Sequence, residues 1–154
     1  MNSKEISRCL LADVHTRRVF RGIFPRDRLP QRINARCPSA YVINTDRSSG
    51  PGQHWVCVWF NGRGRAEYFD SFGLPPTHPS IENFILRHST HYTYNQRLLQ
   101  SLISSACGLY VLYYIMMKSR GARLVQVQRV FDINRLWSND RRVWSLMQQL
   151  RRRS

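Results

Sequence analysis

The stretch HWVCVWF at residues 54–60 decides the fold of this chain. It is rich in Val and Trp and does not alternate polar with apolar residues, which is typical of a strand buried on both faces. Asn61-Gly62 then gives a tight connection, and residues 66–70 form the returning strand of a hairpin. The start of one antiparallel strand lies beside the end of its neighbour, so we expect His54 and Asp70 to be adjacent.

Helical periodicity surrounds this hairpin on both sides. It predicts helices over residues 3–15, 79–88, 125–131 and 140–153. Short strands are predicted at residues 41–44 and 92–99. Residues 20–30 are broken by Gly and Pro and read as a loop or an extended segment. Strands in the middle with helices around them predict an α+β fold, with a small mixed or antiparallel sheet flanked by helices.

The apolar run at residues 107–117 is eleven residues long, which is too short to cross a bilayer. We interpret residues 107–118 as a buried central helix capped by Ser104 or Ser105, although a short apolar run also fits a strand. The N-terminal residues contain no apolar signal core. These features predict a soluble protein with no membrane partner.

Charge and length limit the functional class. The 154 residues fit a single domain spanning 1–154, and 24 Lys and Arg against 9 Asp and Glu give a net charge of +15. All but two of the basic residues are arginine, which holds phosphate with a planar fork. The charge favours DNA bound through its phosphates without sequence reading, whereas a solvated surface and a skewed genome composition are the alternatives.

The four cysteines lie far apart at positions 9, 37, 57 and 107, with no Cys-x-x-Cys pair. This spacing supports neither a zinc site nor a disulfide framework and favours a reducing compartment. His88 and His91 lack further ligands nearby, so no metal is predicted. Trp55 and Trp59 are expected in the core. The spacing of seven between Trp137 and Trp144 also suggests core positions.

Four residues together could perform thiol chemistry. Cys107 stands just before Gly108 at a proposed helix start, where backbone N–H groups and the helix dipole lower a thiol pKa; the alternative is an inert core cysteine. His54 opens a strand beside a glycine-rich turn and could act as base, with Asp70 fixing its tautomer. The amide of Gln100, seven residues before the cysteine, could donate to an oxyanion.

The order of these residues resembles that of adenain, the adenovirus maturation cysteine protease family, over about residues 20–146. The resemblance rests on Asn44-Thr45, a glycine loop, His54-Trp55, Asp70-Ser71-Phe72-Gly73, Gln100 and Ser105-Ala106-Cys107-Gly108-Leu109. The wider clan includes the proteases that remove ubiquitin-like proteins, and it shares the order His, Asp, Gln, Cys. A glutamate often stands in the adenovirus enzymes at the position of Asp70.

The resemblance implies a cysteine endopeptidase with Cys107 as nucleophile, His54 as general base and acid, and Asp70 orienting the histidine. Gln100 and the backbone N–H of Cys107 would form the oxyanion hole. Cleavage would follow small residues, Gly above all, in viral precursor proteins, in the host nucleus and the virion. No cofactor is implied for the chemistry.

The family also suggests two activators, DNA and a short viral peptide. The cysteine that would bond such a peptide falls near Ser89, and no cysteine is present there. A disulfide-linked peptide is therefore not expected. Two alternative functions remain open from the sequence: removal of a ubiquitin-like modifier, and a basic DNA-packaging protein without enzymatic activity.

Overall fold

A five-stranded mixed sheet forms the centre of the computed structural model, which describes residues 1–152 and side chains through residue 150. The strands lie in chain order, and the outer pairs β1–β2 and β4–β5 are parallel while the inner pairs are antiparallel. Their bounds are β1 Phe20–Pro25, β2 Pro38–Asn44, β3 Trp55–Asn61, β4 Arg65–Phe69 and β5 His91–Tyr94.

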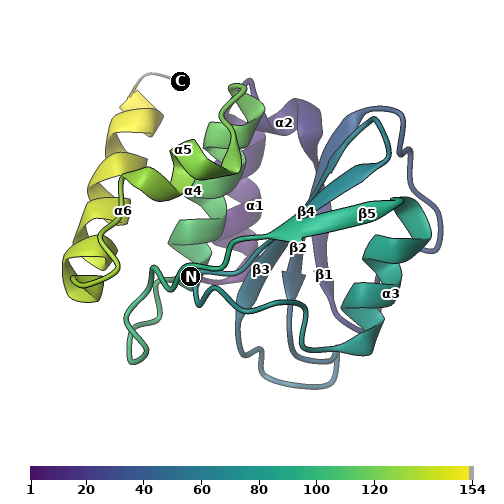
Figure 1. Ribbon diagram of the computed structural model, residues 1–154, viewed down its shortest axis with the longest axis horizontal. Coiled ribbons are helices and arrows are strands. Elements are labelled where there is room, and N and C mark those ends of the chain that lie inside the picture. Colours follow the sequence, from purple (N-terminus) through teal and green to yellow (C-terminus); the bar gives the residue numbers. More distant parts are fainter. Residues whose placement is uncertain (153–154) are drawn as a thin grey trace.

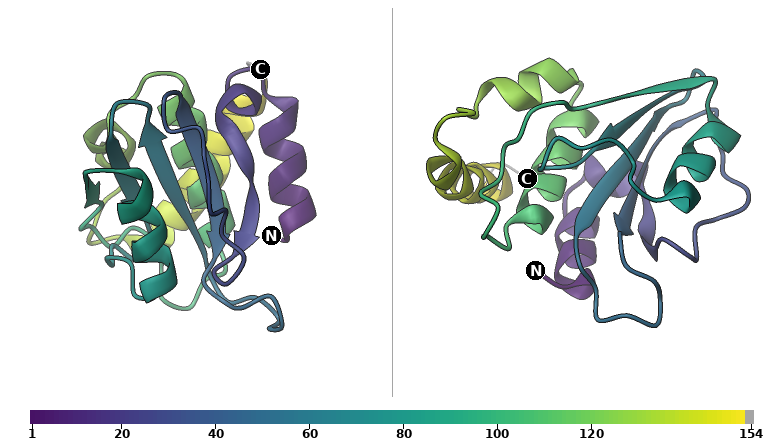
Figure 2. Two further views of the ribbon diagram at one scale, coloured as in Figure 1. Left: turned by 90° about the vertical axis from the view of Figure 1, so that its right-hand side faces the viewer. Right: turned by 60° about the horizontal axis from the view of Figure 1, so that its bottom comes forward.

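Helices cover both faces of this sheet (Figures 1 and 2). One face carries α3 alone, and the other carries a layer that includes α1, α4 and α6 (Figure 1). The helices are α1 Ser3–Ala12, α2 Thr16–Val19, α3 Pro79–His88, α4 Cys107–Ser119, α5 Leu124–Arg129 and α6 Leu136–Arg152. The predicted α+β class with a mixed sheet is confirmed.

Strand β3 is buried on both faces, as its sequence predicts. Cys57 and Trp59 face the core beneath α4, whereas Val56, Val58 and Phe60 face the core beneath α3. Because both faces of the sheet are covered, the strand needs no polar positions.

Helix α4 runs through the larger core, and nine of its thirteen residues are buried. The predicted serine cap is wrong, because Ala106 occupies the N-cap position and no side chain bonds the free N–H groups there. The hydroxyl of Ser104 is instead buried without a hydrogen-bond partner. The first turn of α4 therefore has backbone N–H groups that no side chain caps, and they lie next to Cys107, the first residue of the helix.

Several predicted boundaries need correction. Residues 20–25, predicted as a loop or an extended segment, are extended and pair with β2 as a parallel strand. The strand expected at 92–99 is confined to His91–Tyr94. Helix α1 ends at Ala12 rather than at residue 15, and α5 ends at Arg129 rather than at residue 131.

Helix α6 starts four residues earlier than predicted, so Asp140 lies beyond its first turn. The Asp140 carboxylate accepts a hydrogen bond from the hydroxyl of Tyr110 at 2.9 Å. Trp137 and Trp144 are 61% and 57% exposed, so their predicted core positions are wrong. Arg151–Arg153, the last residues of the helix predicted over 140–153, fall outside the described side chains.

In the described part of the chain, no helix combines the length and apolar character that crossing a bilayer requires.

Candidate active site

The hairpin of β3 and β4 brings His54 and Asp70 together, as its predicted geometry requires. The antiparallel register pairs Cys57 with Phe69, so the residue before β3 lies beside the residue after β4. Nε2 of His54 lies 2.7 Å from Oδ1 of Asp70. The bond uses one ring nitrogen and leaves Nδ1 for a second partner.

The carboxylate of Asp70 is buried and held from several directions. Its Oδ1 also accepts the backbone N–H of Phe72 at 2.8 Å. Asn95 brackets the same residue, because its Oδ1 accepts the N–H of Asp70 at 2.8 Å while its amide nitrogen donates to the Asp70 carbonyl. A side chain with this many fixed neighbours has little freedom to turn away from the imidazole.

The ring of Phe72 stacks on the imidazole of His54, with centroids 4.6 Å apart and planes 21° from parallel. The stacking and the bond to Asp70 together fix both the plane and the rotation of the histidine ring. Sequence reasoning gave neither Phe72 nor Asn95 a role. Phe72 lies in a turn and Asn95 follows a short strand, and neither position belongs to a periodic pattern that would indicate a functional role.

Cys107 is the first residue of α4, and its thiol lies close enough to the His54 imidazole for each group to shift the pKa of the other. Burial alone would raise the pKa of this thiol. The bond to His54, the backbone N–H groups of Trp55 and Gly108, and the charge of the imidazole outweigh burial and lower the Cys107 pKa.

The pKa of His54 shifts in the opposite direction, upward. Burial alone would lower the pKa of His54, but the hydrogen bonds and negative charges of Asp70 and Cys107 raise it to about 9. A lowered thiol pKa next to a raised imidazole pKa favours a thiolate–imidazolium pair over the neutral thiol and imidazole.

The other three cysteines lack this environment. All four are free thiols; Cys57 is fully buried, and burial raises its pKa far above the ordinary value. Cys37 is exposed and Cys9 partly exposed. Among residues 1–152, no three His, Cys, Asp or Glu side chains cluster closely enough to hold a metal ion.

Gln100 is buried next to the loop that leads into α4. Its Nε2 donates to the carbonyl of Ser104 at 2.7 Å, and its Oε1 accepts the hydroxyl of Ser71 at 2.6 Å. The amide thus connects the loop before Cys107 to the turn after Asp70. Its nitrogen carries a second proton that the bond to Ser104 does not use.

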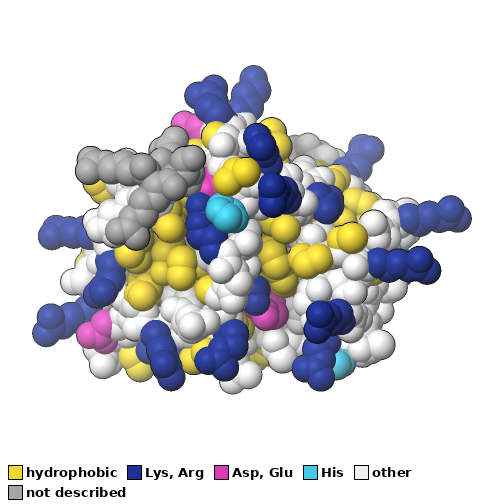
Figure 3. All heavy atoms as spheres, turned by 90° about the horizontal axis from the view of Figure 1, so that it is seen from above, with side chains coloured by type: hydrophobic (Ala, Val, Ile, Leu, Met, Phe, Trp, Pro, Cys, Tyr) yellow, Lys and Arg dark blue, Asp and Glu magenta, His cyan; other side chains and the backbone are white. Residues whose placement is uncertain are grey.

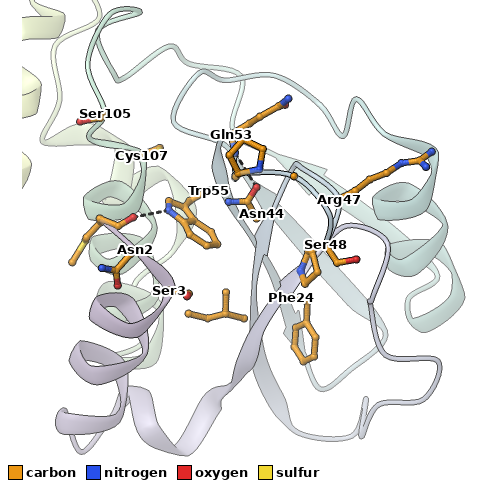
Figure 4. Close-up of a pocket in the computed structure, with 16 residues that line it drawn as sticks. Asn2, Ser3, Phe24, Asn44, Arg47, Ser48, Gln53, Trp55, Ser105 and Cys107 are labelled. Carbon is orange, nitrogen blue, oxygen red and sulfur yellow. Dashed lines mark hydrogen bonds between the residues drawn. The ribbon is translucent and has the colours of Figure 1, made fainter.

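A cleft of about 540 Å³ extends from the thiol of Cys107 toward the glycine-rich loop at residues 50–53 (Figure 4). Asn44 holds this loop, because its Oδ1 accepts the N–H groups of Asp46 at 2.9 Å and Gln53 at 3.1 Å. Gly52 has a φ of +92°, a conformation that favours glycine. Figure 4 shows Trp55 between the loop and α4, so the cleft has an aromatic wall.

The space beside Gly108 is filled by Met1, because a Cβ added at this glycine would lie 2.9 Å from Cβ of Met1. The indole N–H of Trp55 donates to the Met1 carbonyl at 3.0 Å (Figure 4). Gly108 therefore admits the side chain of Met1 next to the nucleophile.

These pKa shifts predict selective alkylation of one thiol. We expect iodoacetamide to modify Cys107 at pH 6 at least about tenfold faster than the exposed Cys37, because only Cys107 has a thiol pKa lowered by an imidazolium. Mass spectrometry of peptides from the modified protein measures both rates. In denaturant the two rates should converge, and equal rates in the folded protein would contradict the ion pair.

A thiol, an imidazole and a carboxylate joined in this order, with the thiol at a helix N-terminus, form the arrangement that thiol hydrolases use for nucleophilic catalysis. No protein-family model matches the chain. It is 33% identical over 85 residues to the cysteine protease S273R of African swine fever virus, isolate Tick/Malawi/Lil 20-1/1983. It is 32% identical over 85 residues to the SUMO-1 cysteine protease S273R of isolate Tick/South Africa/Pretoriuskop Pr4/1996.

Each of these two matches covers 48% of this chain and 31% of the relative, so the chain spans about a third of the length of these curated proteins. A solved structure, described as the crystal structure of Se-Met ASFV pS273R protease, has 28% sequence identity and a TM-score of 0.48. That match covers 58% of this chain and 37% of the other. These relatives are thus named as viral cysteine proteases, but not as adenains.

Proposed function

We propose that this chain is a viral cysteine endopeptidase of the clan that includes the ubiquitin-like-protein proteases. One observation carries the proposal: His54 bonds the buried carboxylate of Asp70, and its imidazole and the Cys107 thiol shift each other's pKa toward the ion pair. An inert core cysteine would have a raised thiol pKa, as Cys57 has.

The mechanism follows from this geometry. The Cys107 thiolate attacks the scissile carbonyl carbon, a C–S bond forms, and the carbonyl π electrons move to the oxygen. The oxyanion collapses, the C–N bond breaks, and imidazolium His54 gives its proton to the leaving amine. Neutral His54 then takes a proton from water, which attacks the thioester and releases the acid and the thiol. Asp70 keeps the imidazole oriented throughout.

We assign the oxyanion contacts to Gln100 and the backbone N–H of Cys107. The unused amide proton of Gln100 and the open first turn of α4 support this assignment. Both donors are fixed before the substrate arrives, Gln100 by its bonds to Ser71 and Ser104. Such donors need no reorganisation when the charge develops.

We propose that the substrate is a viral precursor protein that is cut after small residues, with Gly preferred. The cleavage would take place during virion maturation, in the host nucleus and the virion. The aromatic wall of Trp55 opposite the Gly50–Gly52 loop supports a small residue near the thiol. A short viral peptide is proposed as an activator, bound without a disulfide link.

The test uses fluorogenic peptides that place Gly-Gly or Gly-x before the cut, with and without DNA. The proposal expects cleavage after the glycine by the unmodified protein, and none by Cys107→Ala. Cleavage that does not depend on Cys107 would refute the assignment, and so would absence of cleavage under all conditions.

Removal of a ubiquitin-like modifier is the second candidate function. The name SUMO-1 cysteine protease, which several relatives carry, favours it. The two functions share one catalytic site, so a substrate panel separates them. Efficient cleavage of an intact folded modifier with poor cleavage of short peptides would select the second function.

DNA binding is proposed as a property of the same protein, based on its net charge of +15. Within residues 1–150, the ion pairs between basic side chains and carboxylates involve Lys118, Arg120 and Arg135. Figure 3 shows basic side chains spread over one face and projecting from its rim rather than gathered in one cluster. A dispersed charge suits phosphate contacts without base reading.

This charge predicts salt-sensitive binding. With about six phosphate contacts, the affinity for duplex DNA should fall about 10³-fold between 50 and 200 mM salt, because condensed counterions are released on binding. Fluorescence anisotropy measures the slope, and Cys107→Ala should give the same slope. A flat salt dependence would contradict phosphate contact. DNA binding with no proteolysis under any condition would favour the packaging function instead.

A further inference from the structure

Two large aromatic side chains project from the outer surface of α6. Trp137 and Trp144 are 61% and 57% exposed, whereas Val143 and Met147 on the same helix are buried. Figure 1 shows α6 at the outer edge of the helical layer, with α4 and α5 on its inner side. Exposed tryptophans that lie close together on one helix are typical of a binding surface.

The two indoles line one depression of about 410 Å³. We call its lining the tryptophan patch, which consists of Ser104, Leu109, Trp137, Asp140, Arg141 and Trp144. The loop before the nucleophile adds further apolar surface, because Leu102 and Ile103 are 70% and 82% exposed.

Two polar atoms of the tryptophan patch are buried without a hydrogen-bond partner among the described residues. They are Oδ2 of Asp140 and Oγ of Ser104. The other carboxylate oxygen of Asp140 accepts from the Tyr110 hydroxyl. A buried acceptor left unpaired costs free energy.

The tryptophan patch is continuous with the catalytic cleft. A depression of about 380 Å³ lies between them, sharing Met1 and Ser105 with the cleft and Ser104, Leu109 and Trp144 with the patch. A polypeptide held at Cys107 can therefore run onto the patch across the loop that precedes the nucleophile.

We propose that the tryptophan patch binds an apolar segment of the substrate polypeptide, several residues away from the scissile bond. The inference rests on the proposed endopeptidase function and adds a specificity site to it. The segment carries an apolar or aromatic side chain between the two indoles and acidic residues beside it. Arg141 and the net charge of +15 favour those acidic residues.

The experiment compares a short Gly-Gly peptide with the same peptide extended by twelve residues on either side of the cut. The extension contains Leu, Phe and Glu, and a matched extension replaces Leu and Phe by Ser. The unmodified protein should show at least about tenfold higher kcat/KM for one of the apolar extensions, mainly through a lower KM. The side that benefits shows the direction in which the substrate leaves the cleft.

Trp137→Ala and Trp144→Ala should each remove most of this advantage and leave cleavage of the short peptide within about twofold, because neither indole lines the cleft. Trp144→Phe should keep part of it. Leu86→Ala is the matched control, since Leu86 is 50% exposed on α3 on the other face of the sheet. An advantage unaffected by either tryptophan variant, or none for either extension, would overturn the proposal.

A measurement of peptide affinity tests the tryptophan patch independently of catalysis. In Cys107→Ala, isothermal titration with the extended peptide measures affinity even if the protein cleaves nothing, and Trp144→Ala should weaken that affinity about tenfold. Equal affinity would refute the patch, whereas binding without cleavage would refute only the endopeptidase function. Dimerisation abolished by Trp144→Ala without any effect on peptide affinity would assign the patch to a second copy and overturn the proposal.

Discussion

Replacing Cys107 by alanine should lower kcat/KM for a cleaved peptide by on the order of 10⁶-fold, the scale seen when a covalent triad loses its nucleophile. The sulfur is the atom that bonds the substrate, and no neighbouring group can replace it. His54 and Asp70 remain in place in the variant, but they can only assist water. Initial rates at pH 7 with a fluorogenic Gly-Gly peptide measure the loss.

The fold should survive this substitution, because alanine keeps the backbone of the first turn of α4 and removes one sulfur atom. Circular dichroism and thermal unfolding check this. Cys37→Ser is the matched control: it changes an exposed thiol and should leave the rate unchanged. A Cys107→Ala protein that is folded and still cleaves would remove the basis for the proposed mechanism.

The pairing of His54 with Asp70 could be predicted from the sequence because it depends on local structure. A tight connection between two strands fixes their register, and the register makes the residues at their open ends neighbours. The contact between Cys107 and His54 has no such basis. It depends on α4 packing against β3 across fifty-three positions, and only the resemblance to a protease family indicated it.

The tryptophans of α6 show the opposite case. A spacing of seven places Trp137 and Trp144 on one side of a helix, but it does not say which side meets the core. The structure turns Val143 and Met147 inward, so the indoles face outward. Asn95 was missed for a related reason: it bonds the backbone of Asp70, twenty-five positions away, and such long-range bonds leave no pattern in the sequence.

Replacing Asp70 by asparagine should reduce kcat/KM by on the order of 10²–10⁴-fold, the range that positioned acid–base groups contribute. The amide oxygen can still accept from His54 and from the N–H of Phe72, so the geometry is kept. The negative charge is lost, and with it one of the causes that raise the His54 pKa to about 9. The imidazolium form is then less stable, and less of it is present to protonate the leaving amine.

The pH dependence distinguishes this charge effect from a general loss of structure. Acylation needs a thiolate and an imidazolium together, so the unmodified protein should be active above the lowered Cys107 pKa and lose activity as the pH rises through about 9. In Asp70→Asn the alkaline limb should move to lower pH because the His54 pKa falls. The alkylation midpoint of Cys107 should move to higher pH, since a less cationic imidazole stabilises the thiolate less. A damaged fold would lower the rate at every pH without moving either limb, whereas unchanged limbs in a folded, slow variant would mean that Asp70 acts on His54 through position alone.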